Sequence, residues 1–253
     1  MIGWESADLV GVATIDRPER RNALNAELCS QLLARLEAEP DLRAVVITGA
    51  GDKAFCAGAD LVTRAADTAE PGSADTFRPA FDRLLDAVVD YRAPVLAAVN
   101  GAAIGAGQQL AVACDLRVAA FGATFSIPAG RLGVFLSPPN VQRLALLVGQ
   151  GAARDLLLTA RTVDADEAAA IGLVQRRVPN ALDAALELAA EIADLAPLTV
   201  QGHKRALNLV ARGLDPAAID EMRALEDRAF ASRDLQEGLA AFAEKREPHF
   251  EGR

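Results

Sequence analysis

The chain has 253 residues, enough for one large domain or for a core with a small appendage. Apolar residues make up 51% of it, aromatic residues only 4%, and the formal net charge is −9, which argues against nucleic acid and anionic membranes as partners. The sequence shows no secretory signal and no apolar run long enough for a membrane span. Three cysteines without metal-ligand spacing fit a reduced compartment, and together these features predict a cytoplasmic protein.

Apolar periodicity predicts alternating strands and helices along the first 120 residues. Residues 8–15 alternate like a strand, and residues 25–39 have the spacing of an amphipathic helix that begins at Asn25. Residues 43–49 form a continuous apolar run, which is typical of a strand buried on both faces.

The next segment, 62–77, is polar and rich in turn residues, which predicts a mobile loop. A helix marked by Leu84, Leu85, Val88 and Val89 follows it, and then a strand at 94–99. This alternation indicates an α/β core with parallel strands and crossover helices.

The second half of the chain is mainly helical. A further strand is expected at 173–178, and from about residue 180 onward the pattern is helix, with a hinge at 195–197. Residues 232–250 are expected to form an amphipathic helix that needs a surface to cover. We therefore divide the chain into a core, 1–195, and a C-terminal helical region, 196–253.

Residues 101–115, GAAIGAGQQLAVACD, place a glycine turn between a buried strand and the start of a helix. Free backbone N–H groups at such a junction receive an anion or an oxygen that becomes one. Leu110 stands where a dinucleotide fingerprint needs its third glycine, and no G-K-[ST] occurs, so nucleotide binding is excluded. Residues 51–61 form a second junction of this kind, and two of them can aim two backbone donors at one carbonyl oxygen, as in an oxyanion hole.

Six ordered segments resemble the crotonase superfamily, the enoyl-CoA hydratase/isomerase group. They are RRNALN (20–25), AFCAGADL (54–61), VNGAAIGAGQQLAVACDLRVAA (99–120), LLLTAR (156–161), AIGLV (170–174) and AFAEKR (241–246). The resemblance implies an α/β core of repeated ββα units, a helical trimerisation region, and homotrimers often paired into hexamers. It also implies an acyl-CoA ligand, with coenzyme A as part of that ligand, and no separate cofactor or metal.

The same resemblance assigns roles to individual positions. The thioester oxygen would be held by the backbone N–H groups of Ala59 and Ala106. Positions that line the adenine and pantetheine of coenzyme A match Ala23, Leu24, Ala57, Gly58, Asp60 and Leu61. Phe242 and Lys245 match C-terminal residues that reach coenzyme A, often from a neighbouring subunit. Our own candidates for its phosphates are Arg20, Arg21 and Arg64.

Both glutamates that hydratases of this family use for acid–base chemistry are replaced, by Gln109 and Ala129. Ser137 stands where isomerases of the family carry a glutamate. Between residues 90 and 155 the one acidic residue is Asp115, for which we expect a structural role, and no histidine or lysine occurs there. Apolar residues at 129 and at Phe135 and Leu136 suggest a pocket for a medium or long acyl chain.

The leading interpretation is a fatty acyl-CoA-binding protein, a carrier in lipid metabolism that delivers its ligand to an enzyme partner. One alternative is an enoyl-CoA hydratase or isomerase with weak or non-standard activity. Another is a thioesterase or decarboxylase that combines the oxyanion hole with a base such as Asp82 or Tyr91. A third is a scaffold subunit that modifies an active partner of the same fold.

Overall fold

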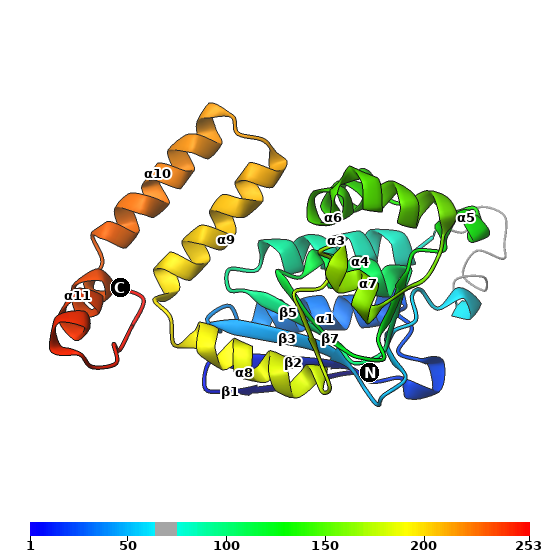
Figure 1. Cartoon of the computed structure of the whole chain (residues 1–253), viewed down its shortest axis with the longest axis horizontal. Coiled ribbons are helices and arrows are strands. Elements are labelled where there is room, and N and C mark those ends of the chain that lie inside the picture. The colour runs from blue at the N-terminus through cyan, green and yellow to red at the C-terminus, as the bar shows by residue number, and fades with distance from the viewer. Residues whose placement is uncertain (64–74) are drawn as a thin grey trace.

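Two sheets form the core of the computed structural model, which describes residues 1–63 and 75–253 (Figure 1). The strands of the larger sheet are β1 (Ile2–Ala7), β2 (Val10–Ile15), β3 (Ala44–Gly49), β5 (Val95–Val99), β7 (Leu116–Ala120) and β10 (Arg176–Val178). They lie side by side in that order, β1 antiparallel to β2 and each later pair parallel. The smaller sheet consists of β4 (Ala54–Cys56), β6 (Ala102–Ile104), β8 (Thr124–Ser126) and β9 (Val163–Asp164).

A ββα unit recurs along the first half of the chain, as expected. In each unit one strand joins the larger sheet and the next joins the smaller one: β3 with β4, β5 with β6, and β7 with β8. The last two units continue into α4 (Ala106–Ala113) and α5 (Ala129–Leu132). Each crossover therefore brings the end of a short strand to the same edge of the smaller sheet, where a helix begins.

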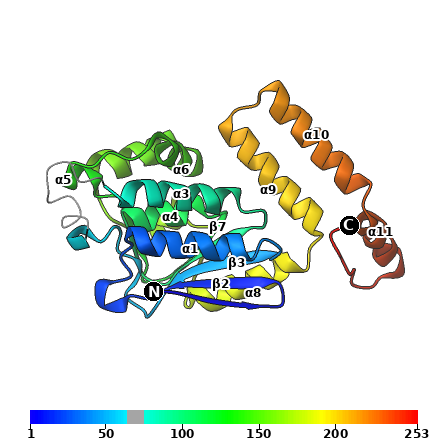
Figure 2. The ribbon, with the colours of Figure 1, turned by 180° about the vertical axis from the view of Figure 1, so that it is seen from behind.

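Helices cover both faces of the larger sheet, which explains its continuous apolar strands. Val45 and Ile47 of β3 pack in the core that includes α1 (Ala26–Ala38) and α3 (Phe77–Asp90). Ala44 and Val46 face the opposite side, where α8 (Ala181–Ala193) packs (Figure 2). Asn25 caps α1 as predicted, because its side chain accepts the Leu28 N–H at 2.9 Å.

The remaining helices lie beyond these layers. They are the 3-10 helix η1 (Pro18–Arg20), α6 (Pro138–Thr159), α7 (Ala165–Ala170), α9 (Pro197–Arg212), α10 (Pro216–Phe230) and α11 (Arg233–Glu244). Helices α9 to α11 extend away from the sheets as an arm (Figure 1). The arm begins after α8 ends, close to the predicted hinge. None of the helices in the described part of the chain is long and apolar enough to cross a membrane.

Lys204 fastens the arm to the core. Its buried ammonium donates to the Val88 carbonyl at 3.3 Å, to the Ala93 carbonyl at 2.9 Å and to Asp115 Oδ2 at 2.7 Å. The same Asp115 oxygen accepts the Val95 N–H at 2.7 Å, at the start of β5. Asp115 thus has the structural role expected of it. Lys204 of α9 also provides a donor for the Val88 carbonyl, which lies in the last turn of α3 and has no partner within that helix.

Several boundaries differ from the sequence predictions, among them that of the strand expected at 173–178, which begins only at Arg176. Strand β1 was not predicted, and the expected strand 8–15 begins at Val10, because Asp8 and Leu9 form a turn with positive φ. The loop expected at 62–77 ends earlier, since α3 starts at Phe77, and residues 64–74 lie outside the described residues. The helix expected to run to residue 250 ends at Glu244, because the tail folds back and Asp234 accepts the Glu251 and Gly252 N–H groups.

Candidate functional site

A cleft of about 650 Å³ opens where the two glycine junctions meet. Its walls come from the junctions at 57–61 and 104–106, from α3, and from the segment 127–140 that contains α5. Of the residues singled out in the sequence, the cleft is lined by Ala57, Gly58, Ala59, Leu61, Ala106, Gln109, Ala129, Phe135, Leu136, Ser137 and Asp82. Residues from four separate stretches of the chain therefore meet in one place.

Close backbone packing brings the two junctions together. Strands β4 and β6 pair in parallel, so their ends lie next to each other. A Cβ on Gly107 would come within 2.0 Å of the Cys56 carbonyl oxygen. Gly58, at φ 106°, leaves room for the Ile104 carbonyl, which a Cβ there would approach to 2.9 Å. Glycine at these two positions is what lets the start of α4 rest against the end of β4.

The N–H groups of Ala59 and Ala106 both have no acceptor among the residues that the structure describes. Leu24 forms a parallel bridge with Ala59, in which the Leu24 N–H donates to the Gly58 carbonyl and its carbonyl accepts the Asp60 N–H. The N–H of the bridged residue itself therefore points away from Leu24. Ala106 is the first residue of α4, where the helix offers its N–H no partner. Two unpaired donors in one cleft can receive a single oxygen.

Gln109 is held in a fixed orientation. Its Nε2 donates to the Gly105 carbonyl at 3.3 Å, and its Oε1 accepts from Asn140 Nδ2 at 2.9 Å. Asn140 in turn accepts from Arg143 at 2.8 Å. The other position of interest, Ala129, presents only a methyl group to the cleft. Neither side chain gives or takes a proton near neutral pH.

Two carboxylates line the cleft within the described residues, Asp75 and Asp82. Asp75 Oδ1 accepts the Phe77 and Arg78 N–H groups at the start of α3, at 3.2 and 3.3 Å. Asp82 Oδ1 accepts the hydroxyl hydrogen of Ser137 at 3.3 Å.

The other base considered from the sequence, Tyr91, is not in the cleft, and that suggestion is wrong. Its hydroxyl donates to the Glu39 carbonyl, and burial raises its pKa to about 12.

Apolar side chains form the far wall of the cleft. Phe77 and Phe81 stack with ring centroids 5.2 Å apart, and the buried side chain of Leu136 lines the same cleft. Phe135 and Leu132 are exposed at the mouth, Phe135 to 86% of its surface. Arg78 and Arg131 also line the cleft, and sequence reasoning missed them because nothing near them in the sequence marks a site. The wall suits an alkyl chain.

Asp60 does not line the cleft; its side chain stabilises the 57–61 junction through hydrogen bonds and an ion pair. Its Oδ2 pairs with Arg17 at 3.0 Å, and its Oδ1 accepts the Val62 and Thr63 N–H groups at 3.2 Å. Burial raises the pKa of this carboxyl, but the hydrogen bonds from Thr63 and Arg17 outweigh it and hold the pKa below its usual value.

Other predicted ligand residues lie outside the cleft of the single chain. Ala23 and Leu24 are buried beside the 57–61 junction, while Arg20 and Arg21 are exposed. The Arg21 carbonyl accepts the Ala57 N–H at 3.0 Å, so this loop adjoins the edge of the cleft. Arg64 lies outside the described residues. Phe242 and Lys245 belong to the end of the arm and do not line the cleft (Figure 1).

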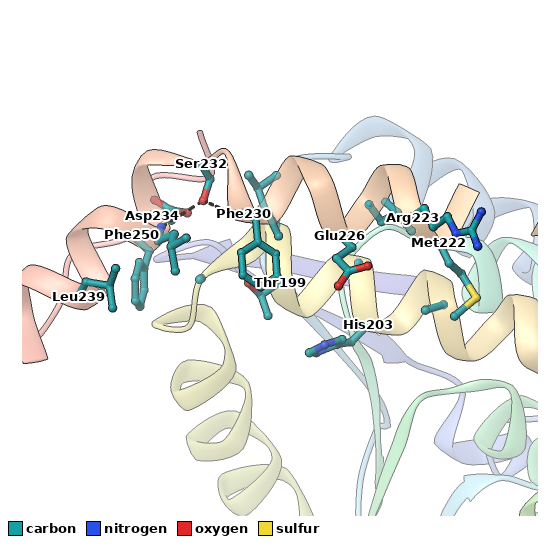
Figure 3. A pocket seen from close by; sticks show the side chains of 18 of the residues that line it. Thr199, His203, Met222, Arg223, Glu226, Phe230, Ser232, Asp234, Leu239 and Phe250 are labelled. Carbon is teal, nitrogen blue, oxygen red and sulfur yellow. Dashed lines mark hydrogen bonds between the residues drawn. The ribbon is translucent and has the colours of Figure 1, made fainter. Parts of the chain in front are cut away.

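A second cavity, of about 780 Å³, lies between the helices of the arm. His203 of α9 and Glu226 of α10 extend into it, and Phe230, Leu239 and Phe250 form its apolar end (Figure 3). Phe230 is 69% exposed and Leu239 63% exposed. The arm of a single chain therefore leaves large apolar side chains in contact with solvent.

The three cysteines are core residues, as the sequence indicated. Cys29, Cys56 and Cys114 are buried and unpaired, and burial raises the pKa of each thiol to about 12. A thiol with that pKa is not ionised near neutral pH and is a poor nucleophile. The described residues contain no group of three or more His, Cys, Asp or Glu side chains placed to hold a metal.

Comparison with known proteins gives one consistent result. The model of the family described as enoyl-CoA hydratase/isomerase matches residues 5–253. A Mycobacterium tuberculosis protein named "Probable enoyl-CoA hydratase echA6" is 42% identical over 100% of both chains. A short-chain-enoyl-CoA hydratase of Clostridium acetobutylicum is 37% identical, over 96% of this chain and 94% of its own. The crystal structure of a Bacillus anthracis enoyl-CoA hydratase superposes with a TM-score of 0.90 at 33% identity, covering 100% of this chain and 99% of the other.

Proposed function

The chain belongs to the enoyl-CoA hydratase/isomerase family, and on that premise we propose that it is a fatty acyl-CoA-binding protein of lipid metabolism. The thioester oxygen is received by the N–H groups of Ala59 and Ala106, and the acyl chain lies along the wall of Phe77, Phe81 and Leu136. The protein holds its ligand without hydrating it and serves as a carrier.

One observation supports this proposal. The cleft contains two backbone N–H groups, of Ala59 and Ala106, that have no acceptor among the described residues, and it lacks a carboxylate at positions 109 and 129. Hydration needs one group to activate water and one to deliver a proton, and a general acid or base contributes about 10²–10⁴ in rate. Gln109 and Ala129 supply neither. The donors remain able to hold and polarise a carbonyl oxygen.

We propose a homotrimer, or a dimer of trimers, in which the arm meets neighbouring copies of the chain. The exposed apolar residues of the second cavity are the surface that such contacts would cover. The boundary between the core, 1–195, and the arm, 196–253, is part of this proposal. Phe242 and Lys245 then reach coenzyme A in a neighbouring subunit, because they do not line the cleft of their own chain.

Ala106→Pro tests the proposed oxygen site. Proline removes the N–H but is tolerated at the first position of a helix, so the fold is expected to survive. Binding of a long-chain trans-2-enoyl-CoA, measured by calorimetry, should weaken about 3- to 10-fold, the effect of one hydrogen bond. With the wild type, the titration should saturate at about one ligand per subunit, and the enoyl-CoA recovered from the calorimeter cell should be chemically unchanged.

Ala26→Pro is the matched control, because Ala26 is also the first residue of a helix and its N–H also has no acceptor in the described chain. It should bind as the wild type does. Unchanged affinity in Ala106→Pro would remove the oxygen site from the proposal. Recovery of 3-hydroxyacyl-CoA from the wild type would make the protein a hydratase.

A further inference from the structure

Asp82 is a carboxylate of the cleft that the binding function does not use. It stands on α3, one turn after Arg78, and both side chains line the cavity that holds the unpaired N–H groups. Asp75, the other carboxylate there, bonds to the backbone at the start of its own helix. Asp82 Oδ1 accepts the hydroxyl hydrogen of Ser137, and its Oδ2 forms no hydrogen bond with the residues that the structure describes.

A short chain of contacts connects Asp82 to the donor end of the cleft. Ser137, its partner, immediately precedes α6, and the Ser137 carbonyl accepts the Asn140 N–H at 3.0 Å. The Asn140 side chain donates to Gln109, which bonds to the carbonyl of Gly105, the residue before Ala106. Asp82 is therefore connected to the turn that presents the Ala106 N–H by three side-chain hydrogen bonds and one turn of α6.

Asp75 and Asp82 are the two side chains of the described lining that can accept a proton near neutral pH, and Asp75 already accepts two N–H groups at the start of α3. That lining contains no histidine, lysine, cysteine or tyrosine, and the Gln109 amide is not a base. A polarised thioester is acidic at C2, the carbon next to its carbonyl, because the electron pair left by the proton moves toward the oxygen. The carboxylate of Asp82 is the group of this cleft that is available to accept that C2 proton.

We propose that Asp82 exchanges a proton with C2 of the bound acyl-CoA, an inference that rests on the proposed binding of the thioester. The C2–H bond breaks and its proton passes to the Asp82 carboxylate. The electron pair forms a C1–C2 double bond while the carbonyl pair moves to the oxygen held by Ala59 and Ala106. Return of a proton from Asp82 to C2 restores the acyl-CoA, so no other reactant is consumed. Ser137 positions the carboxylate.

Deuterium exchange tests this step without any net reaction. Octanoyl-CoA, which is saturated and cannot be hydrated, is incubated with the whole protein in D₂O, and deuterium at C2 is followed by mass spectrometry. The wild type should exchange well above the protein-free rate. Asp82→Asn should lose about 10²–10⁴ of that rate, while the affinity for octanoyl-CoA, measured by calorimetry, stays within about threefold.

Companion variants separate the carboxylate from a general effect on folding. Asp82→Glu keeps a carboxylate and should retain part of the exchange, and Ser137→Ala should reduce it less than Asp82→Asn does. Asp90→Asn removes the same charge from an exposed site of α3, where Asp90 pairs with Arg212, and should exchange as the wild type.

The outcomes separate the two proposals. Saturable binding with no wild-type exchange, or equal exchange in Asp82→Asn and the wild type, overturns the role of Asp82 and leaves binding intact. Absence of saturable binding overturns the binding function, and the exchange inference with it.

Discussion

Gln109 and Ala129 leave two positions of this cleft without a side chain that can exchange a proton near neutral pH. The amide of Gln109 both donates to a carbonyl and accepts from Asn140, a combination that a carboxylate does not reproduce. Ala129 shares the cleft with Phe81 and Leu136. Positions 109 and 129 therefore carry no charge, and in our proposal an ionised carboxylate buried there beside the acyl chain would be costly.

Restoring both carboxylates, as Gln109→Glu with Ala129→Glu, should weaken binding of a long-chain acyl-CoA about tenfold or more. The new carboxylate at 109 faces the Gly105 carbonyl oxygen, and the one at 129 loses water when the chain binds. Calorimetry measures the affinity. Ala129→Gln is the control, because glutamine has the volume of glutamate without its charge. Equal affinity in the double variant and the wild type would contradict the explanation.

Lys204 makes the buried polar contact between the arm and the core, beside less buried bonds such as that of Asn208 to the Val89 carbonyl and that of Arg212 to Asp90. Lys204→Met should destabilise the protein by about 3–5 kcal/mol, because it leaves Asp115 and two carbonyls without their donor. Urea unfolding followed by circular dichroism gives the change. Arg212→Met, on the same helix, removes an exposed ion pair with Asp90 and should cost at most about 1 kcal/mol. Similar losses in the two variants would argue against a special role for Lys204.

The carboxylate of Glu237 holds the tail after α11, and protonation of that carboxylate in acid should weaken the attachment of the tail. Hydrogen bonds from the Arg246 side chain and the His249 N–H lower the pKa of Glu237 to about 2. The folded pKa lies below the unfolded one, so this contribution is complete above about pH 4.5 and is lost as the pH falls toward 2. The His249 amide should exchange with solvent faster at pH 3 than at pH 6, after correction for the intrinsic rates. In Glu237→Gln that difference should disappear; its persistence would exclude Glu237 as the cause.

Elements with a strong local pattern could be predicted from the sequence. Helix α1 has both a cap and a regular apolar spacing, and β3 is apolar along its whole length. Strand β1 could not, because no glycine or proline marks the two-residue turn, Asp8 and Leu9, that joins it to β2. The returning tail could not, because its partner Asp234 lies 17 residues before Glu251 in the chain. The glycine junctions were visible as motifs, whereas the place of Asp82 in the cleft depends on how α3 packs against residues 127–140.

At the scale of the whole molecule, the arm explains why a single chain is an incomplete unit in our proposal. Its cavity exposes Phe230 and Leu239, which a monomer leaves in water. The wild type should sediment as a trimer or hexamer, and Leu239→Glu should shift it toward monomer. Leu9→Glu changes an exposed leucine in the β1–β2 turn and should leave the sedimentation unchanged. A wild-type monomer at micromolar concentration would contradict the proposed assembly.

The contact between Gly107 and Cys56 has a consequence for how such a protein can diversify. Substitutions at 109 and 129 change side chains and need not move the backbone, so they can change which reaction a bound thioester undergoes. A methyl group at 107 would approach the Cys56 carbonyl oxygen to 2.0 Å and push α4 away from β4, separating the two N–H groups that we propose as the donors to the thioester oxygen. In our proposal the binding of an acyl-CoA thus depends on main-chain atoms. Proteins of this fold can therefore lose one reaction or gain another through side-chain substitutions and still bind the same ligand.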